Sequence, residues 1–231
     1  MDFIAEGFRH AVALLVGGDP DTWFAIGLSL WTTLLALGIG AAVGVPLGGA
    51  TGLFRPPGHR VLVVLFRVGM SMPTVVIGLL LFGLLSKRGP LAHLDLLYTP
   101  WAIVAGQALL AAPILASFAH AALAGLDPRV RETVATHGGG RLLALRLALG
   151  EVRPTLVATL LNAFGRCITE LGIVLLVGGS LRWKTRNLPA LIALETSRGE
   201  FGRALAPGLV LMALACGAAL VAERVGRETR R

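Results

Sequence analysis

The segment DPRVRETVATHGGGRLLALRLALGEVRP, residues 127–154, is the longest polar-rich interruption in an otherwise hydrophobic chain. Its pattern predicts a helix, a break at the glycines 138–140, and a second helix that ends at Pro154. Each predicted helix has an apolar side, and basic residues keep the segment in water. The apolar positions are Val134, Leu142, Leu145 and Leu149, and the basic positions are Arg129, Arg131, Arg141, Arg146 and Arg153. We therefore expect the apolar sides of this segment to bind a cytosolic partner.

Within this segment, Gly138 stands six positions after Glu132. The spacing resembles the EAA loop of ABC importer permeases, in which an acidic residue, two small residues and a glycine form a coupling helix that docks into the ATPase subunit. The resemblance implies these ATPase-coupling residues: Glu132, Thr133, Val134, Ala135, Gly138, Gly139 and Arg141. Thr133 and Val134 replace the usual alanines, and Pro154 falls later than in the common pattern. The alternative is an ordinary amphipathic loop between two membrane spans.

The composition indicates an integral membrane protein. Hydrophobic residues make up 55% and charged residues 15% of the chain, with a mean hydropathy of +0.76, whereas about a quarter of the residues in a soluble domain are charged. The basic residues lie at the ends of apolar stretches, which fits contact with membrane lipid and argues against a nucleic-acid partner. Cys167 and Cys216 lack metal-ligand spacing, so we expect no metal site and no disulfide framework.

Five apolar stretches predict an all-α membrane protein with five transmembrane helices: 22–54, 61–86, 101–126, 155–179 and 204–222. We interpret residues 1–22 as an interfacial amphipathic segment, 23–223 as the transmembrane permease domain with the loop 127–154, and 224–231 as a basic cytoplasmic tail. Pro73 should kink the second span. A ridge of small residues should let another helix approach the first span closely. The ridge consists of Gly40, Gly44, Gly48 and Gly52.

The fourth predicted span carries polar residues near its middle: Asn162, Arg166, Thr169 and Glu170. A charge at that depth costs about 2.5 to 3.5 kcal/mol unless it is paired or faces water. One interpretation is that these residues line a translocation path. The other is that Arg166 and Glu170, one turn apart, form an ion pair that holds the helices together. The sequence leaves both open.

Basic residues also predict the orientation, because cytoplasmic loops carry the excess of lysine and arginine. With the N-terminus outside, inner segments hold eleven of these residues and outer segments hold eight. This orientation, with the C-terminus in the cytoplasm, places the loop 127–154 in the cytosol. It also leaves a basic loop on the outer side that should attract an anion. The residues of interest in that loop are Arg182, Lys184, Arg186, Glu195 and Arg198.

Residues 164–201 carry a longer series of motifs: Gly165 with Arg166, Glu170 with Gly172, Val177 to Gly179, Thr185 with Arg186, and Glu195, Thr196, Gly199 and Phe201. This series resembles the tungstate permeases, within the small MetI-like, type I permeases of molybdate, tungstate, sulfate and methionine importers. The resemblance implies a homodimer around a central pore in the bacterial plasma (inner) membrane. It also implies two copies of a cytosolic ABC ATPase, and an extracytoplasmic oxyanion-binding protein that delivers tungstate, with molybdate or sulfate as alternatives.

The chain lacks the GxxxxGK[ST] phosphate loop and the HExxH and GxSxG motifs of hydrolases. We therefore expect a permease subunit that is not itself an enzyme and binds no cofactor, with ATP and magnesium on the partner ATPase. The alternative function is a secondary anion carrier or channel that works without an ATPase.

Overall fold

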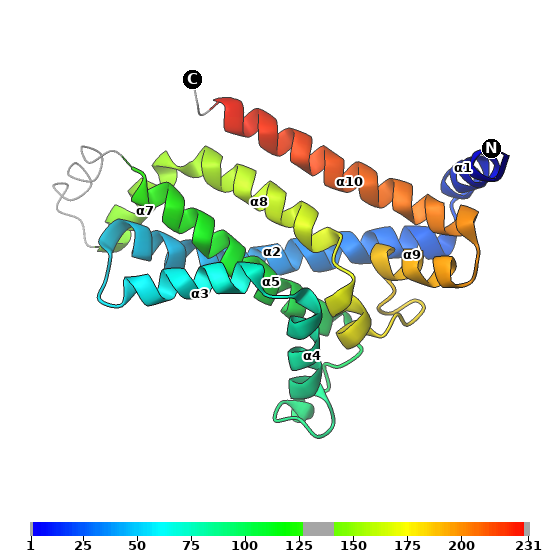
Figure 1. Cartoon of the computed structure of the whole chain (residues 1–231), viewed down its shortest axis with the longest axis horizontal. Coiled ribbons are helices and arrows are strands. Elements are labelled where there is room, and N and C mark those ends of the chain that lie inside the picture. Colours follow the sequence, from blue (N-terminus) through cyan, green and yellow to red (C-terminus); the bar gives the residue numbers. More distant parts are fainter. Residues whose placement is uncertain (1, 127–140, 229–231) are drawn as a thin grey trace. The chain divides into compact units, whose positions relative to one another are not determined.

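The structure is a computed structural model that describes residues 2–126 and 141–228. All regular structure in these two ranges is helical, which confirms the predicted all-α fold. The elements, labelled in Figure 1, are α1 (Asp2–Val16), α2 (Pro20–Phe54), α3 (His59–Ser71), α4 (Thr74–Leu85), η1 (Ala92–Leu94), α5 (Pro100–Ala124), α7 (Arg141–Glu151), α8 (Arg153–Ile168), η2 (Val174–Gly178), α9 (Leu188–Ser197) and α10 (Phe201–Glu228).

Three of these helices, α2, α5 and α10, are long and apolar enough to cross a membrane. The helices α3 and α4 would provide a fourth crossing if the pair is counted as one span. The helices α2 and α5 match the first and third predicted spans closely. The last helix, α10, is longer than its predicted span and includes the start of the predicted tail. The total of five spans stays a prediction.

The second predicted span is interrupted at Met72 and Pro73. Both residues are extended, with φ/ψ of −66°/131° and −60°/127°. Proline disfavours the helical conformation in the residue before it and lacks the N–H that a helix interior needs. The kink expected at Pro73 is therefore a complete break between α3 and α4.

The fourth predicted span, 155–179, is wrong as a single continuous helix. The helix α8 ends at Ile168, and residues 169–171 are irregular. Helical structure resumes at Gly172 and becomes the π-helical turn η2. The side chains that stabilise this break come from residues close to it and from α5.

The chain divides into two compact units, one made of Met1–Ala36, Pro73–Gln107 and Phe164–Gly217, and the other of Leu37–Met72, Ala108–Ala163 and Ala218–Arg231. In the second unit, the glycine ridge of α2 lies directly on α5. A Cβ atom at Gly44 would collide with Ala112, and one at Gly48 would collide with the backbone of Ala116. The predicted close approach is confirmed.

The second unit also contains the contacts of α7. Its side chains Leu145 and Leu149 pack in a cluster around buried Leu123, next to Leu53 at the end of α2. Leu142 is 67% exposed and takes no part in this cluster. On α5, His120 Nδ1 forms a hydrogen bond of 3.1 Å with Thr51 Oγ1. His120 is thus a hydrogen-bonded structural residue.

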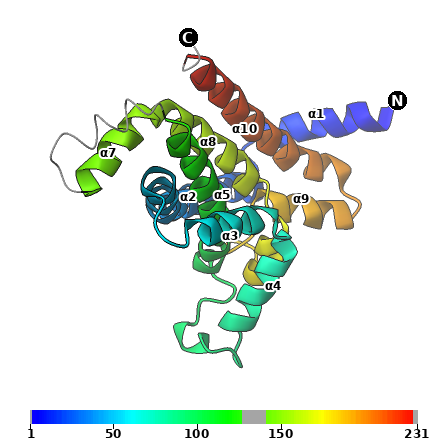
Figure 2. The same cartoon turned by 60° about the vertical axis from the view of Figure 1, so that its left-hand side comes forward.

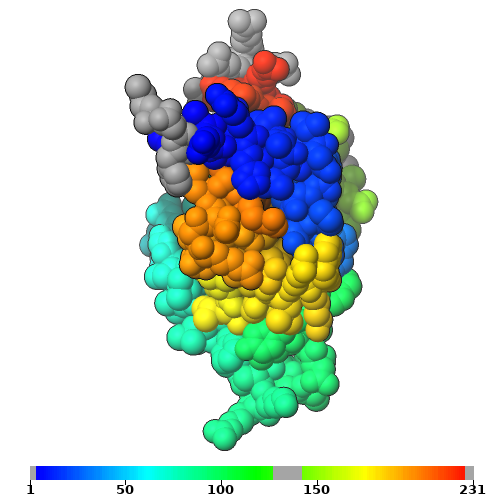
Figure 3. All heavy atoms as spheres, turned by 90° about the vertical axis from the view of Figure 1, so that its right-hand side faces the viewer, coloured from blue at the N-terminus to red at the C-terminus, as the bar shows by residue number. Residues whose placement is uncertain are grey.

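In the first unit, α1 packs on the beginning of α10. Gly7 contacts the ring of Phe201, Gly202 contacts His10, and Figure 3 shows the two segments side by side in blue and orange. A stripe of α1 stays exposed at four-residue spacing: Ile4, Phe8, Val12 and Val16. The predicted amphipathic helix is present, and its place at the membrane surface stays a prediction.

The first unit also contains the short helix α9. Buried Leu188 and Leu191 pack on Ala25 of α2. A short turn joins α9 to α10 (Figure 2). This arrangement brings the end of α9 and the start of α10 to the beginning of α2, where several charged residues meet.

Candidate functional site

The break after α8 is capped by the Glu170 carboxylate. Its Oε1 accepts hydrogen bonds from the backbone N–H groups of Gly172 at 2.8 Å and Ile173 at 3.3 Å. These groups begin the next helical segment and have no partner within it. Glu170 therefore supplies acceptors that the helix itself cannot provide, and its negative charge favours the helix start.

The preceding end of α8 is capped as well. Thr169 Oγ1 donates to the carbonyl oxygens of Gly165 at 2.9 Å and Arg166 at 3.2 Å. Gln107 Nε2, from α5, donates to the carbonyl oxygen of Cys167 at 2.9 Å. Unpaired backbone groups are costly away from water, so a helix break persists only where other groups satisfy them. The break is a stable feature of this chain.

Arg166 and Glu170 form the ion pair that the sequence suggested. Arg166 Nη1 lies 3.0 Å from Glu170 Oε2, with side-chain exposures of 50% for the arginine and 3% for the glutamate. Glu170 lies beyond the end of α8, so the four polar residues do not lie on one continuous helix. Asn162 and Thr169 are exposed, so three of the four predicted path residues are accessible and Glu170 is not.

The first turn of α4 packs against this break. A Cβ atom at Gly172 would lie 3.0 Å from Val75 Cγ2 and 3.4 Å from Thr74 Oγ1. Gly78 makes a similarly close contact with Ile173. The glycines let the two segments approach, so the break at Pro73 and the break after α8 lie close together. Glu170 Oε1 also lies 3.3 Å from the position of a Cβ atom at Gly172.

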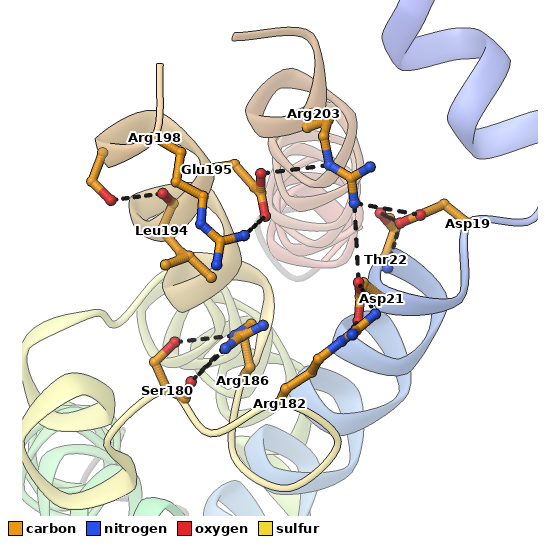
Figure 4. A network of polar contacts seen from close by, with 11 residues as sticks. Asp19, Asp21, Thr22, Ser180, Arg182, Arg186, Leu194, Glu195, Arg198 and Arg203 are labelled. Atoms are coloured by element: carbon orange, nitrogen blue, oxygen red, sulfur yellow. Dashed lines mark hydrogen bonds and ion pairs between the residues drawn. The ribbon is translucent and has the colours of Figure 1, made fainter. Parts of the chain in front are cut away.

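The predicted outer basic loop forms an ion-pair network with acidic residues (Figure 4). Arg182 donates from Nε and Nη2 to both carboxylate oxygens of Asp21, each at 2.9 Å. Arg198 Nη1 lies 3.2 Å from Glu195 Oε1, and Arg203 Nε lies 3.5 Å from Glu195 Oε2. Arg203 also lies 3.8 Å from Asp19 and 4.0 Å from Asp21.

The sequence reasoning missed three members of this network: Asp19, Asp21 and Arg203. Figure 4 shows Arg203 between Glu195 and the two aspartates, which lie at the start of α2. Lys184 is exposed and takes part in none of these ion pairs. Three arginines pair with three carboxylates, so less positive charge remains for an anion than the count of basic residues predicts.

Arg186 differs from the other three arginines, because it donates from Nε and Nη2 to the Ser180 carbonyl oxygen at 3.2 and 3.0 Å. Burial lowers the pKa of Arg186 from its ordinary value. The hydrogen bond to Asp21 raises the pKa of Arg182. Both guanidinium groups remain charged at neutral pH, because the ordinary pKa of arginine lies far above neutral pH.

The predicted coupling residues from Glu132 to Gly139 lie outside the described residues, and so does the Arg141 side chain at the start of α7. In the ranges that the structure describes, no group of three or more His, Cys, Asp and Glu side chains could hold a metal ion.

The candidate site is a helix break that side chains cap, with an exposed arginine beside it. The chain has apolar helices long enough to cross a membrane, and its described residues hold no metal-binding cluster. Comparison with known protein families gives a match over most of this chain. The family described as "Binding-protein-dependent transport system inner membrane component" matches residues 44–231. The chain belongs to this family. The resemblance to ABC importer permeases is thereby confirmed, and so is a membrane protein with several apolar helices.

Three individual relatives are permease proteins, in agreement with the family match. The chain is 36% identical over 212 residues to the tungstate uptake system permease protein TupB of Peptoclostridium acidaminophilum, covering 92% of this chain and 93% of that protein. It is 34% identical over 208 residues to a probable anion ABC transporter permease protein of Haloferax volcanii, covering 87% and 90%. It is 30% identical over 215 residues to the tungstate permease TupB of Campylobacter jejuni, covering 93% and 90%.

Proposed function

We propose that this chain is the permease subunit of an ABC importer for oxyanions, with tungstate as the main substrate and molybdate or sulfate as alternatives. The similarity to tungstate uptake permeases along more than nine tenths of the chain carries the proposal. Two copies of the chain surround the pore, two ABC ATPase subunits drive it, and an extracytoplasmic binding protein delivers the anion. The N-terminus lies outside and the C-terminus in the cytoplasm.

Arg166 is the residue that meets the oxyanion in this proposal. A guanidinium has five N–H donors, and Glu170 is the only hydrogen-bond partner of the Arg166 guanidinium among the described residues. Half of the side chain is exposed, so further donors are available to an anion. Transporters commonly bind substrate where helices are interrupted, because the interruption frees polar groups in an apolar region. Asn162 and Thr169 are exposed on the same helix or directly after it.

In this proposal, the part of the predicted loop 127–154 from Glu132 to Gly138 transmits force from the ATPase. The helix that follows it, α7, packs through Leu145 and Leu149 on a cluster with Leu123 of α5, and both leucines also contact Gly49 of α2. A displacement of α7 would therefore act directly on two membrane-spanning helices. Three leucines of α7 stay exposed and could meet the ATPase: Leu142, Leu143 and Leu147.

The test is uptake of labelled tungstate into proteoliposomes that contain the permease, its ATPase and its binding protein. We expect uptake that requires ATP and all three components, with unlabelled molybdate and sulfate as competitors. A matched preparation with a hydrolysis-deficient ATPase should show no accumulation. Accumulation by the permease alone, driven by an ion gradient, would support a secondary carrier and contradict the proposal.

A further inference from the structure

Glu170 uses its two carboxylate oxygens for different partners. Oε1 accepts from the backbone N–H groups of Gly172 and Ile173, at 2.8 and 3.3 Å. Oε2 accepts from Arg166 Nη1 at 3.0 Å. The carboxylate therefore both caps the second helical segment and fixes the direction of one guanidinium group.

The two side chains differ greatly in accessibility. The Glu170 side chain is 3% exposed and the Arg166 side chain is 50% exposed. An anion arriving from solvent can reach the guanidinium but not the carboxylate. Glu170 is thus placed to influence an oxyanion through Arg166 without touching it.

We propose that Glu170 is a positioning residue and a fixed counter-charge for Arg166, which keeps the affinity for the transported oxyanion low enough for release. This inference rests on the proposed function. An arginine without a counter-charge would attract a doubly charged oxyanion more strongly than an arginine that is already paired. Transport requires a site that binds well enough to admit the ion and weakly enough to let it leave. The Glu170 carboxylate competes with the anion for the N–H donors of Arg166.

The cap and the counter-charge can be separated experimentally. The amide oxygen of glutamine can accept the two backbone N–H bonds, but glutamine carries no charge. A purely structural cap would therefore be largely retained in the Glu170→Gln variant. The counter-charge would be lost, and the Arg166 guanidinium would interact with the oxyanion at full strength.

The experiment compares the wild-type complex of permease and ATPase with the E170Q complex, both in lipid nanodiscs. Equilibrium binding of tungstate is measured without ATP and without the binding protein, and the maximal rate of uptake is measured in proteoliposomes with all components. We expect E170Q to lower the Kd for tungstate about tenfold, the scale of one charge-assisted hydrogen bond, and to lower the maximal rate. A loss of structure would weaken binding instead.

Glu200 offers a control, because its side chain is exposed and forms none of the ion pairs described above. E200Q removes one negative charge from the exposed surface. We expect this variant to leave the tungstate Kd of the complex within about twofold of wild type, because exposed charges are screened over a Debye length.

A double variant tests whether Glu170 acts through Arg166. In an Arg166→Gln background, E170Q should change the tungstate Kd no further, because non-additivity identifies a shared interaction. A wild-type Kd in E170Q, or the same effect with and without Arg166, would overturn the inference. If E170Q does not accumulate in membranes, Glu170→Asn makes the comparison, because asparagine is also uncharged and its side-chain oxygen can cap a helix start. Failure of the wild-type complex to transport any oxyanion would instead overturn the proposed function.

Discussion

Arg166 is the single residue on which the proposed anion path depends. Its guanidinium is half exposed and held at one edge by Glu170. A planar guanidinium can donate two parallel hydrogen bonds to an oxyanion, which the point charge of lysine cannot do. The identity of this residue therefore affects the geometry of anion recognition as well as the charge.

We predict that Arg166→Gln lowers the rate of tungstate uptake about 10- to 100-fold, the range expected for loss of a hydrogen bond to a charged group. Arg166→Lys should restore part of the rate. Uptake into proteoliposomes with the ATPase and the binding protein measures the effect. The basal ATPase rate of the complex should stay near the wild-type value, which separates loss of anion contact from loss of assembly. Wild-type uptake in R166Q would remove Arg166 from the path.

At the scale of elements, close packing of α2 on α5 organises the second unit. The Cβ atom of an alanine at Gly48 would lie 2.7 Å from the Cα and carbonyl carbon of Ala116. Those atoms belong to a helix backbone and cannot turn away as a flexible side chain could. A Cβ atom at Gly38, on the same helix, would meet no atom within 4 Å.

We therefore predict that Gly48→Ala lowers the free energy of unfolding by about 1–3 kcal/mol, the cost of overpacking a close contact. Gly38→Ala is the matched control and should be neutral or stabilising by up to about 1 kcal/mol, because alanine favours a helix. Thermal unfolding of the purified protein in detergent measures both. Equal stability of G48A and G38A would contradict the close approach of α2 and α5.

Hydropathy predicted where α2 and α5 lie, and the four-residue spacing of glycines predicted the face on which they pack. The breaks were harder to predict. Pro73 marked the first break. The break after α8 depends on the Glu170 side chain, which accepts a hydrogen bond from the backbone of Gly172. It also depends on Gln107, which lies 60 residues before its partner Cys167 in the chain. A window of apolar composition contains no information about such bonds, so residues 155–179 have the pattern of one helix.

The candidate site was also predictable only in part, because some of its contacts join residues that lie far apart in the sequence. Charged groups in an apolar stretch need partners, so Arg166 and Glu170 were evident from the sequence. The partners of the outer arginines were not, because Asp21 and Arg182 are 161 positions apart. These groups come together only because α9 and α10 pack near the start of α2. The spacing of residues along the sequence does not predict this packing.

At the scale of the whole molecule, the proposed coupling requires the loop 127–154 to face the cytosol. We predict that a cysteine in place of Thr136 reacts with a membrane-impermeant maleimide in inside-out vesicles and not in intact spheroplasts. Cys167 is buried and Cys216 is exposed, so a Cys216→Ser background removes the accessible native thiol. Labelling of T136C from the outer side would reverse the orientation and exclude contact between this loop and a cytosolic ATPase.

The same loop should act as a lever, and its glycines should be essential to that role. Glycine tolerates backbone conformations that other residues avoid, and proline fixes φ and removes a donor. We predict that Gly138→Pro leaves ATP hydrolysis by the complex within about twofold of wild type but lowers tungstate uptake at least about tenfold, because force no longer reaches α7 and its contacts with α2 and α5. Gly138→Ala, which keeps the N–H, should lie between the two. The ratio of anions accumulated to ATP hydrolysed measures the coupling directly, and a wild-type ratio in G138P would show that transport does not depend on a hinge at this position.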